Sequence, residues 1–500
     1  MFRGVSKSAV FVVVILSLIG SVYANKSLAS DLTFHDSLDW FNVSRDLTDK
    51  DIAGKVVILD FWTYGCVNCV HVLPDLHRLE EEFGDKLAVI SVHSPKFENE
   101  KNPITLRNII ARYEIKHPVA NDIDFKLWRE YGVRAWPTFV VFGPDGKYAG
   151  QLSGEGKYQQ LKRATELLLE RYTGKLNETP LPVKLETMPD GYLKAPGKIA
   201  VNDDYVVIAD SLHHRIVVTD HAGKVRFEIG NGKPKWVDGN FETASFYQPQ
   251  GVIFKDKDTL LVADTGNHTI RQINLDTKTV LTLAGTGQLG RSYVVRPNPL
   301  KTDLRSPWAL ALQDDQLYIA MAGTHQIWKM DLTKNRLMEF AGSGREQLTD
   351  GTLSSSAFNQ PSGLYIQGKK LYVADSEASA IRVIDLKGGM VDTVVGKGLF
   401  DFGDVDGFFK KALLQHTLGV VAVNDSTLII ADTYNHKLKT VDMKKRRVDT
   451  IDVTADQLNE PGGIALWKNN VFIADTNNQA IKVLDLTNNT LSDFVITPPE

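Results

Sequence analysis

A short pattern that recurs six times between residues 193 and 492 restricts the fold more than any other feature of the sequence. Each copy is an apolar run ending in Ala-Asp or, once, in Ala-Met, followed by a polar turn and a second apolar run ending in Asp. Further short apolar runs beside each copy bring every unit to four short strands. Repeated four-stranded units are typical of a β-propeller, so we expect an all-β six-bladed propeller over 193–492. The repeated pairs are Ala209-Asp210, Ala263-Asp264, Ala320-Met321, Ala374-Asp375, Ala431-Asp432 and Ala474-Asp475.

The repeated aspartates are expected to have a structural role. An aspartate at a strand end commonly accepts hydrogen bonds from backbone N–H groups of the next turn. Met321 replaces the aspartate in the third copy, so the hydrogen bonding of that turn should differ. Histidines in or beside these turns leave a metal or catalytic centre open as an alternative; they are His213, His214, His268, His325 and His436.

The repeating unit resembles the NHL repeat. The longer segments between units carry Asp238-Gly239, Asp350-Gly351 and Asp406-Gly407 ahead of Ala-Phe or Ala-Leu pairs, which also suits that family. The resemblance implies a propeller, and such a propeller face more often binds another protein than a metal. We therefore expect a protein partner on the propeller face.

The two cysteines of the chain form one Cys-X-X-Cys motif, Cys66-Val67-Asn68-Cys69. An apolar strand precedes it and a helix is expected to follow, so Cys66 should lie near the positive end of the helix dipole, which favours the reactive thiolate. A redox-active pair is the main interpretation. A static disulfide is a weaker one, because so small a loop removes little entropy from the unfolded chain. A zinc site that adds His71 and His77 also stays open.

Residues 31–172 predict an α/β domain. Apolar strands are expected at 56–61, 87–92 and 136–142, with a hairpin strand at 148–152. Helices are expected from Cys66 onward with a kink at Pro74, at 105–113, at 125–131 and at 158–172. Strands that alternate with helices indicate layers of helix on sheet. Residues 173–192 carry Pro-rich turns without periodicity and are expected to be a linker.

This segment resembles the thioredoxin fold, and more closely its extracytoplasmic thiol–disulfide oxidoreductase branch. Asp60 lies six residues before Cys66, Pro74 lies eight residues after it, and Trp136-Pro137 matches the cis-proline loop of that fold. The dipeptide Val67-Asn68 departs from the Gly-Pro of thioredoxin, so no reduction potential follows from the resemblance. The whole segment from Trp40 to the last blade resembles thioredoxin-like NHL-repeat-containing proteins.

The resemblance implies roles for several residues. Cys66 would attack a disulfide, Cys69 would resolve the mixed disulfide, and Asp60 would be the buried base, its pKa raised by burial. No metal and no cofactor are expected at this site. Residues expected beside the substrate are Trp62, Trp136 and Pro137, and possible redox modulators are His93 and Glu100.

The N-terminal segment predicts export. Arg3 and Lys7 precede an apolar run from Ala9 to Ile19, and small residues lead to Ala24, as in a signal peptide over 1–24. The apolar run is short for a membrane span, although an uncleaved anchor remains an alternative. The expected location is therefore extracytoplasmic, either periplasmic or secreted, with no stable membrane span after cleavage. A net charge of −4 gives no sign of nucleic-acid binding.

Together these features predict a multidomain chain, an α/β thioredoxin-like domain followed by an all-β six-bladed propeller. The main functional hypothesis is an extracytoplasmic thiol–disulfide oxidoreductase that acts on protein thiols and disulfides, with the propeller as an interaction platform. One alternative is a non-catalytic propeller scaffold with an inactive thioredoxin-like domain. Another is a metal-dependent propeller hydrolase or lyase.

Overall fold

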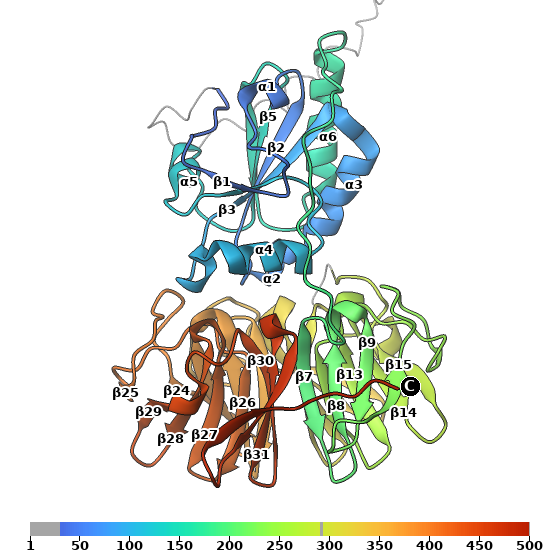
Figure 1. Cartoon of the computed structure of the whole chain (residues 1–500), viewed down its shortest axis with the longest axis vertical. Coiled ribbons are helices and arrows are strands. Elements are labelled where there is room, and N and C mark those ends of the chain that lie inside the picture. The colour runs from blue at the N-terminus through green and yellow to red at the C-terminus, as the bar shows by residue number, and fades with distance from the viewer. Residues whose placement is uncertain (1–30, 291–293, 500) are drawn as a thin grey trace, which may run out of the picture.

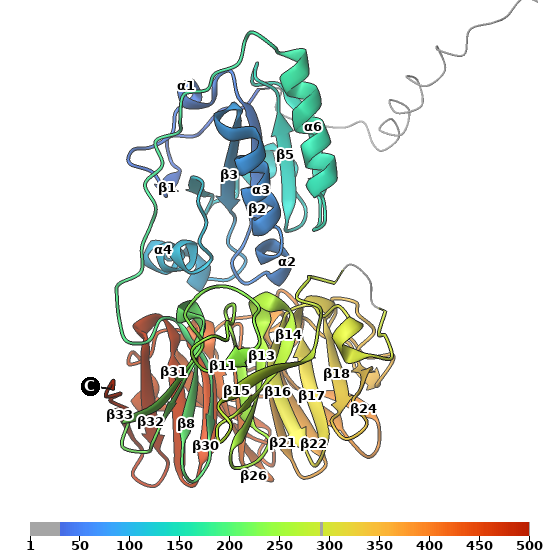
Figure 2. The ribbon, with the colours of Figure 1, turned by 90° about the vertical axis from the view of Figure 1, so that its right-hand side faces the viewer.

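The computed structural model describes residues 31–290 and 294–499, and the segment expected to be a signal peptide lies outside them. An α/β domain stands on one face of a six-bladed propeller (Figures 1 and 2), which confirms the expected fold class. None of the helices in the described residues is long and apolar enough to span a bilayer.

The N-terminal domain is built on a mixed sheet with the strand order β1-β4-β3-β2-β5-β6. Its central strands, β2 (Val56–Trp62) and β3 (Leu87–His93), run parallel and are buried along their whole length. The outer strands are β1 (Asp39–Phe41), β4 (Val119–Asn121), β5 (Thr138–Phe142) and β6 (Tyr148–Ser153).

Helices cover both faces of this sheet, which explains why its central strands are continuously apolar. One face packs against α3 (Leu73–Phe83), α4 (Pro103–Arg112) and α6 (Tyr158–Arg171). The other packs against α1 (Asp49–Ile52) and α5 (Lys126–Glu130).

The helix expected to kink at Pro74 is in fact two helices. The short helix α2 (Val67–Val70) ends before His71, and α3 begins at Leu73. Pro74 lies in the first turn of α3, where the missing N–H has no intrahelical partner to lose. The break leaves α2 as a separate turn that carries the cysteine pair.

The propeller contains six sheets arranged around a central axis. The first strands of neighbouring blades contact one another, and β30 contacts β7, so that the last blade closes on the first. The first blade contains β7 (Pro196–Val201), β8 (Val206–Asp210), β9 (Arg215–Thr219) and β10 (Val225–Ile229), and the second contains β11 (Gly239–Asn240), β12 (Gly251–Phe254), β13 (Thr259–Asp264), β14 (Thr269–Asn274) and β15 (Thr279–Ala284). The third contains β16 (Pro307–Gln313), β17 (Gln316–Met321), β18 (Gln326–Asp331) and β19 (Arg336–Ala341), and the fourth contains β20 (Gly351–Thr352), β21 (Pro361–Gln367), β22 (Lys370–Asp375), β23 (Ala380–Asp385) and β24 (Met390–Val395). The fifth contains β25 (Gly407–Phe408), β26 (Gly419–Asn424), β27 (Thr427–Asp432), β28 (Lys437–Asp442) and β29 (Arg447–Thr450), and the sixth contains β30 (Pro461–Trp467), β31 (Asn470–Asp475), β32 (Ala480–Asp485) and β33 (Thr490–Asp493).

The repeated aspartates cap backbone groups, as predicted. Asp264 accepts the N–H of Tyr247 at 2.8 Å, and Asp375, Asp432 and Asp475 accept equivalent N–H groups in their own blades. The second Asp264 oxygen is 2.8 Å from the guanidinium of Arg271, which has no exposed side-chain surface. A buried cation therefore balances the buried carboxylate.

The third blade replaces this ion pair with an apolar pair. Met321 takes the place of the aspartate, and Trp328, seven residues later, takes the place that Arg271 has relative to Asp264. Both side chains are buried in one core cluster, and the indole N–H donates to Gln326 at 3.0 Å. The loss of the aspartate in this blade is thus accompanied by replacement of the arginine that would pair with it.

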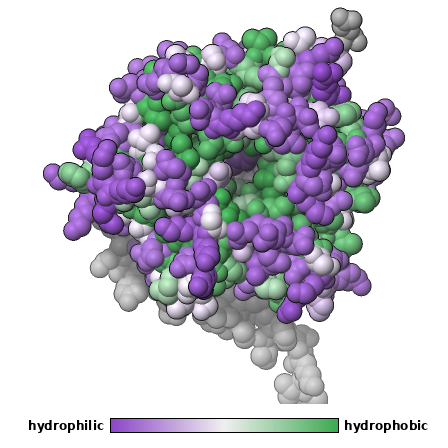
Figure 3. Space-filling view, turned by 90° about the horizontal axis from the view of Figure 1, so that it is seen from below, coloured by the Kyte–Doolittle hydropathy of each residue, from purple (hydrophilic) through white to green (hydrophobic). Residues whose placement is uncertain are grey.

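Figure 3 shows the propeller face that lies opposite the α/β domain. Hydrophilic residues dominate its rim, and apolar residues gather around a central hollow. The other end of the axis is covered by the α/β domain, where the candidate site lies.

Candidate active site between the two domains

The two cysteines lie at the start of α2 with their sulfurs in reach of each other. Cys66 is the N-cap residue, and its Sγ accepts the backbone N–H of Cys69 at 3.2 Å. The sulfurs are 2.6 Å apart as free thiols, so closure to a disulfide needs only a small approach. An N–H that points at Cys66 Sγ stabilises negative charge on that sulfur.

The two thiols differ in exposure. Cys69 is buried, 1% exposed, whereas Cys66 is partly exposed. Burial, followed by the neighbouring Cys66, raises the pKa of Cys69 well above its ordinary value. This asymmetry fits Cys66 as the attacking thiol and Cys69 as the thiol that needs a base before it reacts.

Asp60 lies behind the pair on β2, fully buried. Burial raises its carboxyl pKa to about 7, although nearby His117 and a hydrogen bond from Ser91 lower it in part. Ser91 Oγ is 3.2 Å from one carboxyl oxygen, while the other oxygen has no partner among the described residues. A carboxyl group that titrates near pH 7 suits proton exchange with a thiol.

This pKa predicts how activity and stability depend on pH. As a base Asp60 must be ionised, so disulfide reduction should accelerate as the pH rises through about 7. Asp60→Asn should remove this step and slow the reaction by about 100-fold. The unfolded carboxyl titrates near pH 4, so between about pH 4 and 7 the folded protein holds a proton that the unfolded chain has lost, and the free energy of unfolding should fall across that window.

Single-turnover reduction rates and urea unfolding, both measured from about pH 5 to about pH 9, test these expectations. Asp39→Asn, at an exposed position of the same sheet, is the control and should keep the wild-type profile. An unchanged pH profile in Asp60→Asn would show that another group takes the proton.

Glu100 organises the loop that leads into Cys66. Its buried carboxylate accepts the backbone N–H of Gly65 at 3.0 Å and that of Phe97 at 3.1 Å, and it also accepts the hydroxyl of Thr63. Burial raises the pKa of Glu100 to about 7. Its contacts reach the backbone beside Cys66, and its role as a redox modulator stays a prediction.

Trp62, expected beside the substrate, and His93, expected as a redox modulator, are both buried beneath the cysteine pair. Trp62 is 1% exposed and packs edge-on against His93 at 5.2 Å between ring centroids. Its burial agrees with a packing role beneath the cysteine pair, and its contact with a substrate stays a prediction. His93 hydrogen-bonds Asn121 at 2.9 Å, and burial lowers its pKa to about 4, so the imidazole is neutral.

Trp136 and Pro137 form the loop expected opposite the cysteines. The peptide bond between them is cis, as the resemblance implied. Trp136 is partly buried and packs on Trp128 at 4.6 Å, beside the same core cluster that Cys66 borders. Their contact with a substrate stays a prediction.

The propeller holds the active-site loop directly. The side chain of Gln360, in the loop before β21, accepts the N–H of Val67 at 2.7 Å and donates to the carbonyl of Gly65 at 2.7 Å. These two backbone groups flank Cys66, so one propeller side chain hydrogen-bonds the backbone on both sides of the attacking cysteine. A Cβ on Gly65 would lie 2.8 Å from Glu377 of the propeller, which explains a glycine there.

Further polar contacts between the two domains surround the hydrogen bonds of Gln360. Asn99 donates to Glu460 at 2.7 Å and accepts from His436 Nε2 at 2.8 Å. Buried Lys96 pairs with Glu377 of the propeller. On the other side, His71 contacts Ser306 at 2.7 Å. Buried contacts on several sides fix the α/β domain over the propeller axis.

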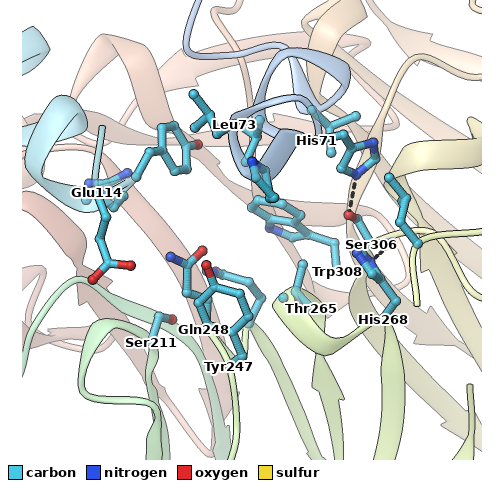
Figure 4. Close-up of a pocket in the computed structure, with 18 of the residues that line it drawn as sticks. His71, Leu73, Glu114, Ser211, Tyr247, Gln248, Thr265, His268, Ser306 and Trp308 are labelled. Carbon is cyan, nitrogen blue, oxygen red and sulfur yellow. Dashed lines mark hydrogen bonds between the residues drawn. The ribbon is translucent and has the colours of Figure 1, made fainter. Parts of the chain in front are cut away.

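A cavity of about 950 Å³ lies between α2 and the mouth of the propeller axis. Figure 4 shows Tyr247 and Trp308 of the propeller, and His71 of the α/β domain with its hydrogen bond to Ser306, around this space. Among the described residues that line it, α2 contributes Val67 and Val70 but neither cysteine. The cavity therefore adjoins the back of the active-site turn.

The turn histidines join neighbouring blades and are not gathered as metal ligands. His214, His268, His325 and His436 each have a positive φ after the Ala-Asp or Ala-Met turn. Each presents Nδ1 to a backbone N–H in the loop that enters the next blade, at 3.1–3.2 Å. In the described parts of the chain, one set of side chains lies close enough together to share a metal ion, and it contains none of the residues of these turns.

The zinc alternative with Cys66, Cys69, His71 and His77 is not assembled. His71 points away to Glu155 at 2.9 Å and to Ser306, and His77 lies near His117. Functional residues that the sequence reasoning missed are Ser91, His117 and Gln360. Ser91 carries a usable signal, because it interrupts an apolar strand in register with Asp60.

The fold and the site define a thioredoxin-fold dithiol protein mounted on an NHL propeller. A thioredoxin-like family model matches residues 54–148, and a model of the NHL repeat matches 458–484. NHL repeat-containing protein 2 of Homo sapiens is 40% identical over 487 residues, covering 87% of this chain and 67% of the human protein. The chain belongs to this family of thioredoxin-like NHL-repeat-containing proteins.

Two further relatives extend the comparison. Protein SUPPRESSOR OF QUENCHING 1, chloroplastic, of Arabidopsis thaliana is 42% identical over 470 residues, which cover 87% of this chain and 44% of the plant protein. The chain thus spans less than half the length of that relative. Thiol-disulfide oxidoreductase YkuV of Bacillus subtilis is 26% identical over 133 residues, covering 26% of this chain and 88% of the bacterial protein.

Proposed function

We propose that the protein is a thiol–disulfide oxidoreductase that works outside the cytosol through Cys66 and Cys69. The observation that carries the proposal is the arrangement of a partly exposed Cys66, a buried Cys69 and a buried carboxyl group that titrates near pH 7. The likeness to YkuV supports the same chemistry for the α/β domain. The signal-peptide pattern of residues 1–24 supports the extracytoplasmic location.

The reaction follows from the positions of these groups. The Cys66 thiolate attacks a substrate disulfide, a mixed disulfide forms, and one substrate thiolate leaves. Asp60 accepts the proton of Cys69, whose sulfur then attacks Cys66 and releases the second substrate thiolate. The substrate gains two electrons, and the protein loses them, which leaves Cys66 and Cys69 joined by a disulfide. An external dithiol reductant would restore the pair.

The propeller would select what reaches Cys66. The propeller face expected to receive a protein partner carries the chain's own α/β domain. Gln360 of the propeller hydrogen-bonds the backbone on both sides of the attacking cysteine. We therefore favour substrate disulfides that lie in small molecules or in extended segments over those inside folded domains. A protein partner on the propeller remains part of the proposal, and the face shown in Figure 3 is open to it.

A redox titration of the cysteine pair tests the proposed function. The full chain is equilibrated with graded ratios of reduced to oxidised dithiothreitol, quenched with acid and alkylated, and the modified thiols are counted by mass spectrometry. We expect one reversible two-electron transition in which both thiols react together. A pair that stays oxidised or stays reduced throughout would contradict the proposal and favour the non-catalytic scaffold.

A further inference from the structure

We propose that His77, Glu80 and His117 form a binding site for a zinc ion on the α/β domain. His77 and Glu80 lie three residues apart on α3 and so project from the same side of the helix. His117 approaches them from the segment between α4 and β4. One ligand atom from each residue lies within 4.8 Å of the other two.

The spacing suits a tetrahedral ion. Zinc–nitrogen and zinc–oxygen bonds near 2 Å place neighbouring ligands about 3.3 Å apart. His117 Nδ1 is already 3.2 Å from Glu80 Oε2. No other pair has to close by more than about 1.5 Å, which side-chain rotation on one helix can supply.

Hydrogen bonds behind the site set the tautomer of His117. Ser91 Oγ donates to Asp60 at 3.2 Å, so it is free to accept the Nε2–H of His117 at 2.8 Å. With its Nε2 turned to Ser91, His117 presents Nδ1 to the Glu80 carboxylate. A zinc ion bound between these two groups would replace the proton that otherwise joins them. An outer hydrogen bond of this kind is also what orients metal-ligating histidines.

His77 supplies the third ligand. Its Nε2 is buried and has no hydrogen-bond partner among the described residues, which is costly for a polar atom. The side chain of Glu80 is 26% exposed, so water can reach the fourth position. Two imidazoles and one carboxylate form a donor set that suits zinc and is poor for Mg²⁺ or Ca²⁺, which prefer oxygen.

The test measures zinc binding in the absence of the thiols, which themselves bind zinc. The full chain carrying Cys66→Ser and Cys69→Ser is titrated with zinc by equilibrium dialysis, and Co²⁺ serves as a spectroscopic probe. We expect one ion per chain, a visible Co²⁺ spectrum of tetrahedral intensity, and no competition by excess Mg²⁺. His77→Ala and Glu80→Gln should each weaken binding at least about tenfold.

A matched control uses a second histidine–carboxylate pair of the same domain. His35 and Glu130 lie 2.8 Å apart at the surface, and among the described residues no third His, Cys, Asp or Glu lies close enough to share a metal ion with them. His35→Ala should therefore leave zinc affinity unchanged. Failure to bind one ion, or binding that survives both His77→Ala and Glu80→Gln, would overturn the proposal. Neither outcome depends on the redox activity of the cysteines.

Discussion

Replacing Cys66 with serine is expected to lower the rate of disulfide reduction at least about 100-fold, equivalent to nearly 3 kcal/mol of transition-state stabilisation. A hydroxyl in this position is not ionised near neutral pH and does not attack a disulfide. Cys69 cannot replace Cys66, because it is 1% exposed and its pKa is raised by burial. The measurement is reduction of a disulfide-bonded model protein by the full chain with dithiothreitol as electron donor.

The partner variant provides the comparison. Cys69→Ser keeps the partly exposed Cys66, so without dithiothreitol it should react with one substrate disulfide per chain and then stop as the mixed disulfide. Each variant changes one sulfur to oxygen at a nearby position. If only Cys66→Ser loses the first reaction with the substrate disulfide, Cys66 is the nucleophile. Retention of full turnover by Cys66→Ser would remove Cys66 from the mechanism.

Truncating Arg271 should lower the stability of the propeller by about 3–5 kcal/mol in the free energy of unfolding. Its guanidinium is fully buried, bonds Asp264 and Asp238 at 2.8 Å, and donates to two backbone carbonyls. Arg271→Ala leaves the buried Asp264 without its cation. Urea unfolding followed by a signal from the propeller measures the loss.

Two further variants show how much of the lost stability comes from leaving a buried charge unpaired and how much from losing side-chain contacts. Arg226→Ala removes an ion pair with Asp220 in which the arginine is 47% exposed, and should cost less than about 1 kcal/mol. The third blade offers an apolar solution in Met321 and Trp328, so Asp264→Met combined with Arg271→Trp should lose less stability than Arg271→Ala alone. A similar loss in all three variants would contradict this account of the blade.

Much of the fold could be predicted because its signals are local. The Ala-Asp strands and their turns recur along the sequence, and the buried strands of the α/β domain are long apolar runs. The strands β1 and β4 escaped prediction because three residues carry too little periodicity. The helix break before Pro74 also escaped, because the apolar spacing continues across it.

The candidate site was predictable only within one domain. Cys66, Cys69 and Asp60 lie within ten residues of one another and share a known motif. Gln360 lies 293 residues from its hydrogen-bond partner Val67 and belongs to no pattern in its loop. The turn histidines suggested metal ligands because their recurrence is visible in sequence, whereas their bonds to backbone N–H groups of the next blade depend on tertiary structure.

The most direct test of the redox account is to trap the mixed disulfide. The Cys69→Ser variant is incubated with a disulfide-bonded peptide, and the adduct is located by mass spectrometry after digestion under acid. The account predicts one peptide attached to Cys66 in nearly every chain, and none in Cys66→Ser. Absence of an adduct on Cys66, with the thiol still accessible to alkylation, would contradict it.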